Sequence, residues 1–155
     1  MVRQRERGVE SGAPGARLGV TDRLGQEHFY IDGCKYPYNP STVVSNGRLY
    51  ILYDRGYINC FNAKSGEMLY EKQVIKRGAG YTVSPWTYDG KLLCMDEGGI
   101  CTVVKEGDTM EILHTNSLAD DDICLSTPAI VGDRLLIRTD KRLYSIRKSQ
   151  VASAK

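Results

Sequence analysis

Short apolar runs alternate with polar turns along most of the chain, and one turn-and-strand phrase recurs at a fixed interval. It reads Asn46-Gly47-Arg48-Leu49-Tyr50-Ile51, then Asp89-Gly90-Lys91-Leu92-Leu93-Cys94, then Gly132-Asp133-Arg134-Leu135-Leu136-Ile137. The basic residues of the three phrases are 43 positions apart in both intervals. Turn residues between strand-forming runs predict hairpins.

Each phrase is surrounded by further strand-like runs. A second turn follows the apolar run, and another strand is predicted after it at residues 57–61, 99–104 and 142–146. A fourth strand is predicted at residues 67–71 and 109–113, and the third repeat has no equivalent.

The period of the repeat indicates the fold class. A spacing of about 40–45 residues made of short strands is typical of β-propeller blades. The sequence therefore predicts an all-β chain of about 2–3 propeller blades, each a four-stranded antiparallel sheet. The predicted region, residues 37–148, divides into units of about 41–83, 84–125 and 126–148.

The central strands are apolar on both faces. Leu49, Ile51 and Tyr53 point to one side of a pleat, and Tyr50 and Leu52 point to the other. Sheets stacked face to face, as blades are, bury both sides. The alternative is a β-sandwich with three similar hairpins, whose solvent-facing strands would alternate more cleanly.

Counted from the basic residue, the second turn differs in length between the units. Arg48 to Ile58 spans 10 positions and Lys91 to Ile100 spans 9. We expect a three-residue loop with Gly56 in the left-handed region in the first unit. In the second unit we expect a two-residue loop, Glu97-Gly98.

That two-residue loop would place two cysteines opposite each other. It pairs Cys94 with Cys101 on adjacent strands, at a separation compatible with a disulfide. Two buried reduced thiols packing as small apolar groups are the alternative that we favour. The cysteine total is odd and no zinc-type spacing is present, so a metal framework is not expected.

Residues 41–70 resemble the PQQ-binding-like β-propeller repeat, and the resemblance extends over about residues 38–148. Blades of this family commonly end in an Ala-x-x-Gly-x-x-x-Trp motif whose Trp docks on the neighbouring blade. Ala63, Gly66 and Tyr70 fill this pattern with Tyr in place of Trp, and the second unit keeps Gly107. The third unit ends at residues 146–148 in the way that these propellers end.

The resemblance implies a fold more directly than a function. Such repeats are shared by quinoprotein dehydrogenases, by an outer-membrane assembly lipoprotein and by many exported proteins, usually periplasmic or on the bacterial cell surface. The dehydrogenases hold PQQ with Ca²⁺ on the propeller axis, use a catalytic Asp and often have a disulfide between adjacent cysteines. No adjacent cysteines occur here, and no cofactor-binding residue of those enzymes maps onto this chain.

Two functions are therefore compared. The first is a non-catalytic binding or scaffold module without a cofactor, the C-terminal fragment of a larger propeller. Its partner would be a protein, or the missing blades, contacted through exposed blade faces and loops. The alternative is the C-terminal part of a PQQ-dependent dehydrogenase. A ring completed by copies of the chain is a further possibility, because 4–8 blades are needed for closure.

Few residues outside the repeats indicate chemistry. Asp120-Asp121-Asp122 is either a Ca²⁺ site or a solvated connection, and we favour the connection. His28 and His114 have no metal-binding spacing, and neither supports a catalytic triad with Ser84 or Ser126. The glycine-rich stretch 77–80 is interpreted as a loop between blades.

Composition narrows the class of partner only slightly. The net charge is +2 with 26% charged residues, and the basic residues are scattered, so no nucleic-acid surface is predicted. No apolar run reaches transmembrane length. Residues 1–36 are expected to be flexible or irregular apart from a strand at 29–31, and residues 149–155 form a tail. The arginine-rich start is a flexible extension or a nucleic-acid tail, and it lacks the apolar core of a secretory signal.

Overall fold

The computed structural model describes residues 17–21, 27–31, 37–75, 80–118 and 121–147. All regular elements in these residues are strands. They are β1 (Arg17–Thr21), β2 (Glu27–Ile31), β3 (Val43–Ser45), β4 (Arg48–Tyr53), β5 (Tyr57–Asn62), β6 (Met68–Val74), β7 (Trp86–Tyr88), β8 (Lys91–Met95), β9 (Ile100–Lys105), β10 (Ile112–Ser117), β11 (Ala129–Val131), β12 (Arg134–Arg138) and β13 (Leu143–Arg147).

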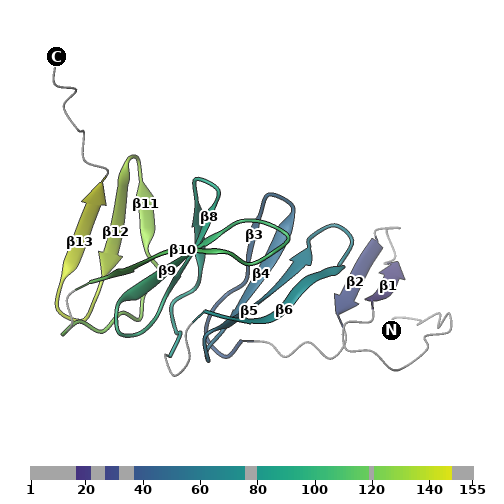
Figure 1. Cartoon of the computed structure of the whole chain (residues 1–155), viewed down its shortest axis with the longest axis horizontal. Coiled ribbons are helices and arrows are strands. Elements are labelled where there is room, and N and C mark those ends of the chain that lie inside the picture. The colour runs from purple at the N-terminus through teal and green to yellow at the C-terminus, as the bar shows by residue number, and fades with distance from the viewer. Residues whose placement is uncertain (1–16, 22–26, 32–36, 76–79, 119–120, 148–155) are drawn as a thin grey trace, which may run out of the picture.

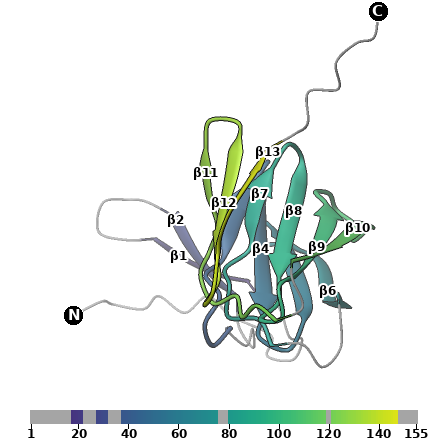
Figure 2. The same ribbon diagram turned by 90° about the vertical axis from the view of Figure 1, so that its left-hand side faces the viewer.

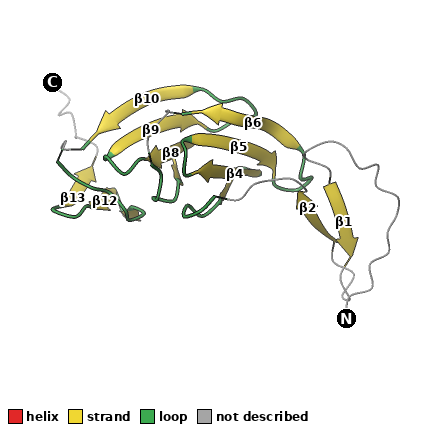
Figure 3. Ribbon diagram, turned by 90° about the horizontal axis from the view of Figure 1, so that it is seen from below, coloured by secondary structure: helices red, strands yellow, loops and turns green. Residues whose placement is uncertain are grey.

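The strands form separate antiparallel sheets that follow one another in chain order. The first sheet is β3-β4-β5-β6, the second is β7-β8-β9-β10, and the third is β11-β12-β13. β1 and β2 form a hairpin at the N-terminal end of the row (Figure 1). Seen from below, the row is curved, with β6 and β10 on its convex side (Figure 3). The predicted all-β fold of propeller-like blades is confirmed.

Equivalent residues of the first two sheets make the same hydrogen bonds. The Ala63 N–H donates to the Gly47 carbonyl at 2.8 Å, and the Glu106 N–H, 43 residues later, donates to the Gly90 carbonyl at 3.1 Å. The recurring turn of the sequence therefore has one structural role, which is to join the first two strands of each sheet and hold the end of the third.

The second turn differs from the prediction. Asp54–Gly56 and Glu97–Gly99 are both three-residue loops, with φ of 79° at Gly56 and 76° at Gly99. The two-residue loop expected at Glu97-Gly98 is wrong because Asp96 closes the longer turn. Its carbonyl accepts from the Gly99 N–H at 3.0 Å, and its Oδ1 accepts from the Ile100 N–H at 2.8 Å.

The third sheet, rather than the second, has the shorter turn. The Thr139 N–H donates to the Arg142 carbonyl at 2.9 Å, which leaves Asp140 and Lys141 as a two-residue loop. The 43-residue spacing therefore runs through the first two turns of the first and second sheets and is broken at this loop of the third sheet.

Gly107 is not the counterpart of Gly66. The Asn62 N–H donates to the Glu67 carbonyl and the Lys105 N–H to the Glu111 carbonyl, so the second unit has one more residue in this turn. The Gly107 N–H instead donates to the Tyr50 hydroxyl of the first sheet at 3.2 Å.

Two expectations concern segments of which little is described. β2 covers the strand expected at residues 29–31. The rest of segment 1–36, apart from β1, and the tail 149–155 lie outside the described residues. No helix among the described residues has the length and apolar character of a membrane span.

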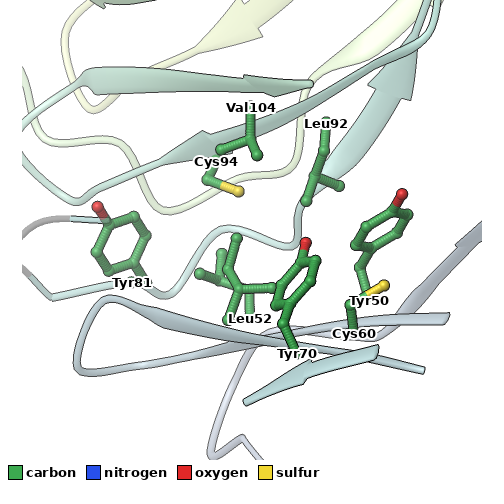
Figure 4. Packing of buried hydrophobic residues seen from close by; sticks show 9 residues of the cluster. Tyr50, Leu52, Cys60, Tyr70, Tyr81, Leu92, Cys94 and Val104 are labelled. Carbon is green, nitrogen blue, oxygen red and sulfur yellow. The ribbon is translucent and has the colours of Figure 1, made fainter. Parts of the chain in front are cut away.

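The core lies between sheets rather than inside any one of them. Buried side chains of the first and second sheets face each other across one interface (Figure 4), where Tyr50, Leu52 and Tyr70 meet Leu92 and Cys94. Tyr70, which stands in place of the Trp of the resembled motif, is buried in this cluster.

The central strands bury both faces, as the sequence predicts. Tyr50 and Leu52 face the second sheet, whereas Ile51, Tyr53 and Phe61 form another buried cluster on the opposite side of the first sheet. A third cluster joins the second and third sheets and includes Met95, Cys124 and Ile137.

Candidate binding surfaces

The segments that connect the sheets are hydrogen-bonded to the sheet before them and to the sheet after them. The Tyr81 N–H donates to the Asp54 carbonyl at 3.0 Å, and the Cys124 N–H donates to the Glu97 carbonyl at 2.9 Å. Each bond joins a connecting segment to the hairpin loop of the sheet before it. Donors and acceptors are both displaced by 43 residues from one bond to the next.

A second pair of bonds joins the same segments to the sheet that follows. The Glu97 N–H donates to the Gly80 carbonyl at 2.9 Å, and the Asp140 N–H donates to the Ile123 carbonyl at 3.0 Å. Because each connection is bonded on both sides, the row is a defined scaffold on which loops and edges have fixed positions.

The serines that begin the units have structural partners. The Ser41 N–H donates to the Ser84 hydroxyl at 2.9 Å, and the Ser84 N–H donates to the Thr127 hydroxyl at 3.2 Å. The Ser126 hydroxyl donates to the Arg138 carbonyl at 2.8 Å. Ser84 and Ser126 thus link and position strands.

The predicted opposition of Cys94 and Cys101 is wrong. Cys94 pairs with Thr102, and Cys101 pairs with Met95. The extra loop residue shifts the register by one, and a shift of one turns a side chain to the other face of a sheet. Cys94 therefore lies between the first and second sheets, and Cys101 between the second and third.

The described cysteines, Cys60, Cys94, Cys101 and Cys124, are all buried free thiols. Burial raises the pKa of Cys60 to about 11 and that of Cys101 to about 12. Such thiols pack as small apolar groups and are poor nucleophiles. Cys34 lies outside the described residues.

The described part of the aspartate run is solvated at Asp121 but not at Asp122. Asp122 is buried and receives hydrogen bonds from Arg142 Nη1, at 2.7 Å, and from the Tyr144 hydroxyl. Asp121 is exposed and pairs with Arg142 at 2.8 Å and with Lys141 at 3.1 Å. The Arg142 guanidinium, followed by Lys141, lowers the pKa of Asp121.

These ion pairs attach the β12–β13 loop to the segment that leads into the third sheet. Asp120 lies outside the described residues, as do residues 77–79 of the glycine-rich stretch. Within the described part of the chain, no group of three or more His, Cys, Asp and Glu residues could hold a metal ion.

His114 is exposed on β10, and His28 belongs to β2, a strand of which only the backbone is described.

The surface that sequence reasoning underestimated is the edge of β13. In the first two sheets the last residue of the third strand bonds to the chain entering the fourth. The Asn62 N–H donates to the Glu67 carbonyl at 2.8 Å, and the Lys105 N–H donates to the Glu111 carbonyl at 2.9 Å. Arg147 has the same position by register. Among the described residues, β13 pairs only with β12.

The register shows which backbone groups face this open edge. Thr139 and Arg142 form a hydrogen-bonded pair at the β12–β13 turn. Hydrogen-bonded and non-hydrogen-bonded pairs alternate along an antiparallel ladder. The N–H and C=O groups of Leu143, Ser145 and Arg147 therefore point away from β12, toward the position of a fourth strand.

No protein-family model and no curated protein matches the chain. Among solved structures, the chain is similar to BamB from Moraxella catarrhalis, with a TM-score of 0.58 and 14% identity over 79% of this chain. It spans 34% of the BamB chain, about a third of its length.

Two further matches have lower scores. A quinohemoprotein alcohol dehydrogenase from Comamonas testosteroni gives a TM-score of 0.46, with 11% identity over 67% of this chain and 17% of its own. A europium-containing methanol dehydrogenase gives 0.43, with 16% identity over 65% of this chain and 22% of its own. The likeness to BamB shows a partial PQQ-like propeller fold, and at this identity it shows the fold alone.

Proposed function

We propose that the chain is a non-catalytic protein-binding module, made of blades that belong to a larger PQQ-like propeller. The observation that carries the proposal is the open edge of β13. A sheet edge with unpaired N–H and C=O groups is a template for an extended segment of another polypeptide. The neighbouring sheets supply the geometry of the complex, because β6 and β10 occupy the equivalent position there.

Membership of a larger propeller is supported at the other end of the row. Tyr38 occupies the position that Tyr81 and Cys124 occupy one and two units later. Tyr81 and Cys124 are buried, at 1% and 0% exposure, whereas Tyr38 is 86% exposed. The position is suited to contact with a further blade. We also propose that the chain is exported, as the family resemblance implies.

The probe for the test is β6, which is the fourth strand of the first sheet. A capped peptide of residues 66–75, which contains β6, is added to the full chain, and hydrogen exchange is measured at individual amides. We expect slower exchange at Leu143, Ser145 and Arg147, because their N–H groups face the edge. No slowing at these amides with the peptide at about 1 mM, near the weak limit of specific binding, contradicts the proposal.

A matched pair of variants locates the binding. Ser145→Pro removes an edge-facing N–H without removing a donor to β12, whereas Ser145→Ala keeps the N–H. We expect Ser145→Pro to weaken peptide binding by about fivefold, the value of one net hydrogen bond, and Ser145→Ala to leave it within about twofold. Trp86 fluorescence checks that both variants are folded.

A separate measurement addresses catalysis. Under the alternative function, the chain with added PQQ and Ca²⁺ reduces an artificial dye in the presence of an alcohol or sugar. Turnover in that assay would contradict a non-catalytic module.

A further inference from the structure

The third sheet has one face against the second sheet and one face turned away from it. Leu135 and Ile137 of β12 and Tyr144 of β13 pack against the second sheet. Since side chains alternate along a strand and paired residues share a face, the register defines the opposite set. This outer face, on the side shown toward the viewer in Figure 2, comprises Val131, Arg134, Leu136, Arg138, Leu143, Ser145 and Arg147.

One pair of these positions is apolar and covered in both inner sheets. Leu52 pairs with Ile58 and Met95 pairs with Cys101, and all four are buried beneath the next sheet. In the third sheet this pair is Arg138 with Leu143.

An arginine at this position disfavours another blade of the same kind. The surface that the second sheet presents to the first is made of Leu92, Cys94 and Val104. Burying the guanidinium of Arg138 against such a surface leaves a charge without a partner, which is costly.

A carboxylate partner is indicated by the equivalent of Arg134. In the first sheet this position is Arg48, whose Nε pairs with Asp108 of the second sheet at 2.8 Å. Arg134 points from the third sheet in the corresponding direction and donates to the Ser145 hydroxyl at 3.0 Å. Within the described residues, none of Arg134, Arg138 and Arg147 is paired with a carboxylate.

Exposed aliphatic side chains lie among these arginines. Leu143 is 72% exposed and Val131 is 58% exposed. Arginines around an aliphatic centre match a partner surface in which carboxylates surround an apolar patch, since bidentate pairing and apolar burial then occur together.

We propose that the outer face of the third sheet docks an acidic protein surface, with carboxylates on Arg134, Arg138 and Arg147 and apolar side chains on Val131, Leu136 and Leu143. The proposal rests on the proposed protein-binding function but concerns a face, whereas that function rests on the edge of β13.

The probe is a capped helical peptide with one leucine stripe flanked by glutamates, because a helix cannot add to a strand edge. Its binding to the full chain is measured by fluorescence anisotropy. We expect binding that weakens as salt rises from about 50 to about 300 mM. A matched peptide with glutamine in place of glutamate should bind at least about tenfold more weakly.

Charge-matched variants locate the surface. Arg134→Gln/Arg138→Gln/Arg147→Gln should lose about tenfold or more in affinity. The control, Arg55→Gln/Lys64→Gln/Lys72→Gln, removes the same charge from exposed positions in the first unit and should change affinity by less than about twofold. Circular dichroism confirms that both variants keep the wild-type fold.

Three results overturn the proposal: no peptide binding by the wild type, equal binding by the two triple variants, or tighter binding of single-stranded DNA of the same charge. The last would indicate a nucleic-acid surface. Comparing Ser145→Pro with Ser145→Ala separates this proposal from the edge function, since both variants lack the hydroxyl that accepts from Arg134 and should bind the helix equally. If the chain does not bind the helical peptide but still binds the 66–75 peptide, the docking face is contradicted and the edge function is not.

Discussion

Gly99 has a φ of 76°, and a Cβ added there would lie 3.2 Å from Cβ of Leu118. Both the backbone conformation and the space disfavour a side chain. Gly98 is its neighbour in the same loop, lacks a positive φ, and would place a Cβ 3.4 Å from Asp96 Oδ1.

We predict that Gly99→Ala lowers the free energy of unfolding by about 1–3 kcal/mol, the cost of a non-glycine residue held in the left-handed region. Gly98→Ala should change it by less than about 0.5 kcal/mol. Urea unfolding of the two variants gives both values, and equal destabilisation would contradict the assigned turn.

The buried thiols predict a specific reactivity. Because burial raises the pKa of Cys60 to about 11 and of Cys101 to about 12, few molecules carry a thiolate at pH 8. Iodoacetamide should leave Cys60, Cys94, Cys101 and Cys124 unmodified in the folded chain and modify all of them in guanidinium. Mass spectrometry of peptides measures this, and rapid labelling of Cys101 in the native chain would be the contrary result.

The raised thiol pKa values also make the stability of the folded chain depend on pH. The folded chain binds the thiol protons more tightly than the unfolded chain does. The contribution is complete below the ordinary thiol pKa of about 8.5, and it is lost as the pH rises above that value.

For individual residues, the sequence was informative about residue types but not about the register of the strands. Gly98-Gly99 is compatible with loops of two or three residues, and the choice is made by the hydrogen bonds of Asp96. Because one residue of slip exchanges the faces, the error in the loop moved Cys101 to the wrong interface.

Between elements, stability comes from the surfaces that sheets bury against each other. Leu52 is fully buried at the first interface, whereas Val44 on β3 is 62% exposed. Leu52→Ala should lower the free energy of unfolding by about 2–5 kcal/mol, through lost transfer energy and a cavity. Val44→Ala should cost less than about 0.5 kcal/mol. Denaturant unfolding compares the two, and similar values would contradict a core located between sheets.

The link between the β12–β13 loop and the preceding segment predicts a pH dependence. Arg142 and Lys141 lower the pKa of Asp121, so the folded chain holds that proton less tightly than the unfolded chain. The stabilisation is present above the ordinary aspartate pKa of about 3.9 and is lost as the pH falls below it.

We expect the free energy of unfolding to fall between about pH 5 and pH 2.5 less steeply in Arg142→Gln than in the wild type. The effect should also decrease in high salt, because the pair is exposed. Arg147→Gln, which removes a cation that pairs with no carboxylate among the described residues, should keep the wild-type slope. Identical slopes for wild type and Arg142→Gln would show that the pair does not contribute.

The local sequence pattern did not predict the partners of these aspartates. Arg142 and Tyr144 are about half a unit away in the sequence, and only the path of the connection brings them to Asp122. A run of acidic residues is commonly a solvated loop, and nothing adjacent to Asp120-Asp121-Asp122 indicates otherwise.

For the whole molecule, the outer face of the third sheet determines whether the row can grow by self-association. Arg138→Leu restores the apolar residue type that Leu52 and Met95 supply in the inner sheets. Since a buried leucine contributes about 1.5–3 kcal/mol, we predict that this variant self-associates at least about tenfold more tightly than the wild type.

Sedimentation velocity measures that association. Arg55→Leu adds the same side chain at an exposed position of the first sheet's loop and serves as the control. If Arg138→Leu sediments like the wild type at all concentrations, the charge of Arg138 is not what prevents self-association through the outer face.

The architecture at this scale was predictable because it depends on spacing alone. Three copies of one phrase at 43 residues favour stacked sheets over a β-sandwich, and apolar residues on both faces of the central strands favour them further. The binding surfaces were less predictable. In the sequence, Arg138 does not differ from other arginines in strands. Only the register shows that it is equivalent to Leu52 and Met95 of the inner sheets.

The hydrogen bonds that join neighbouring sheets have a consequence for how such a chain can change in length. The bonds from Tyr81 to Asp54 and from Cys124 to Glu97 connect residues whose numbers differ by the same amount. Duplication of a 43-residue segment by unequal recombination would therefore reproduce every donor beside its acceptor, whereas a duplication of another length would not. A chain with one whole unit more or fewer could therefore keep the same hydrogen bonds between neighbouring sheets.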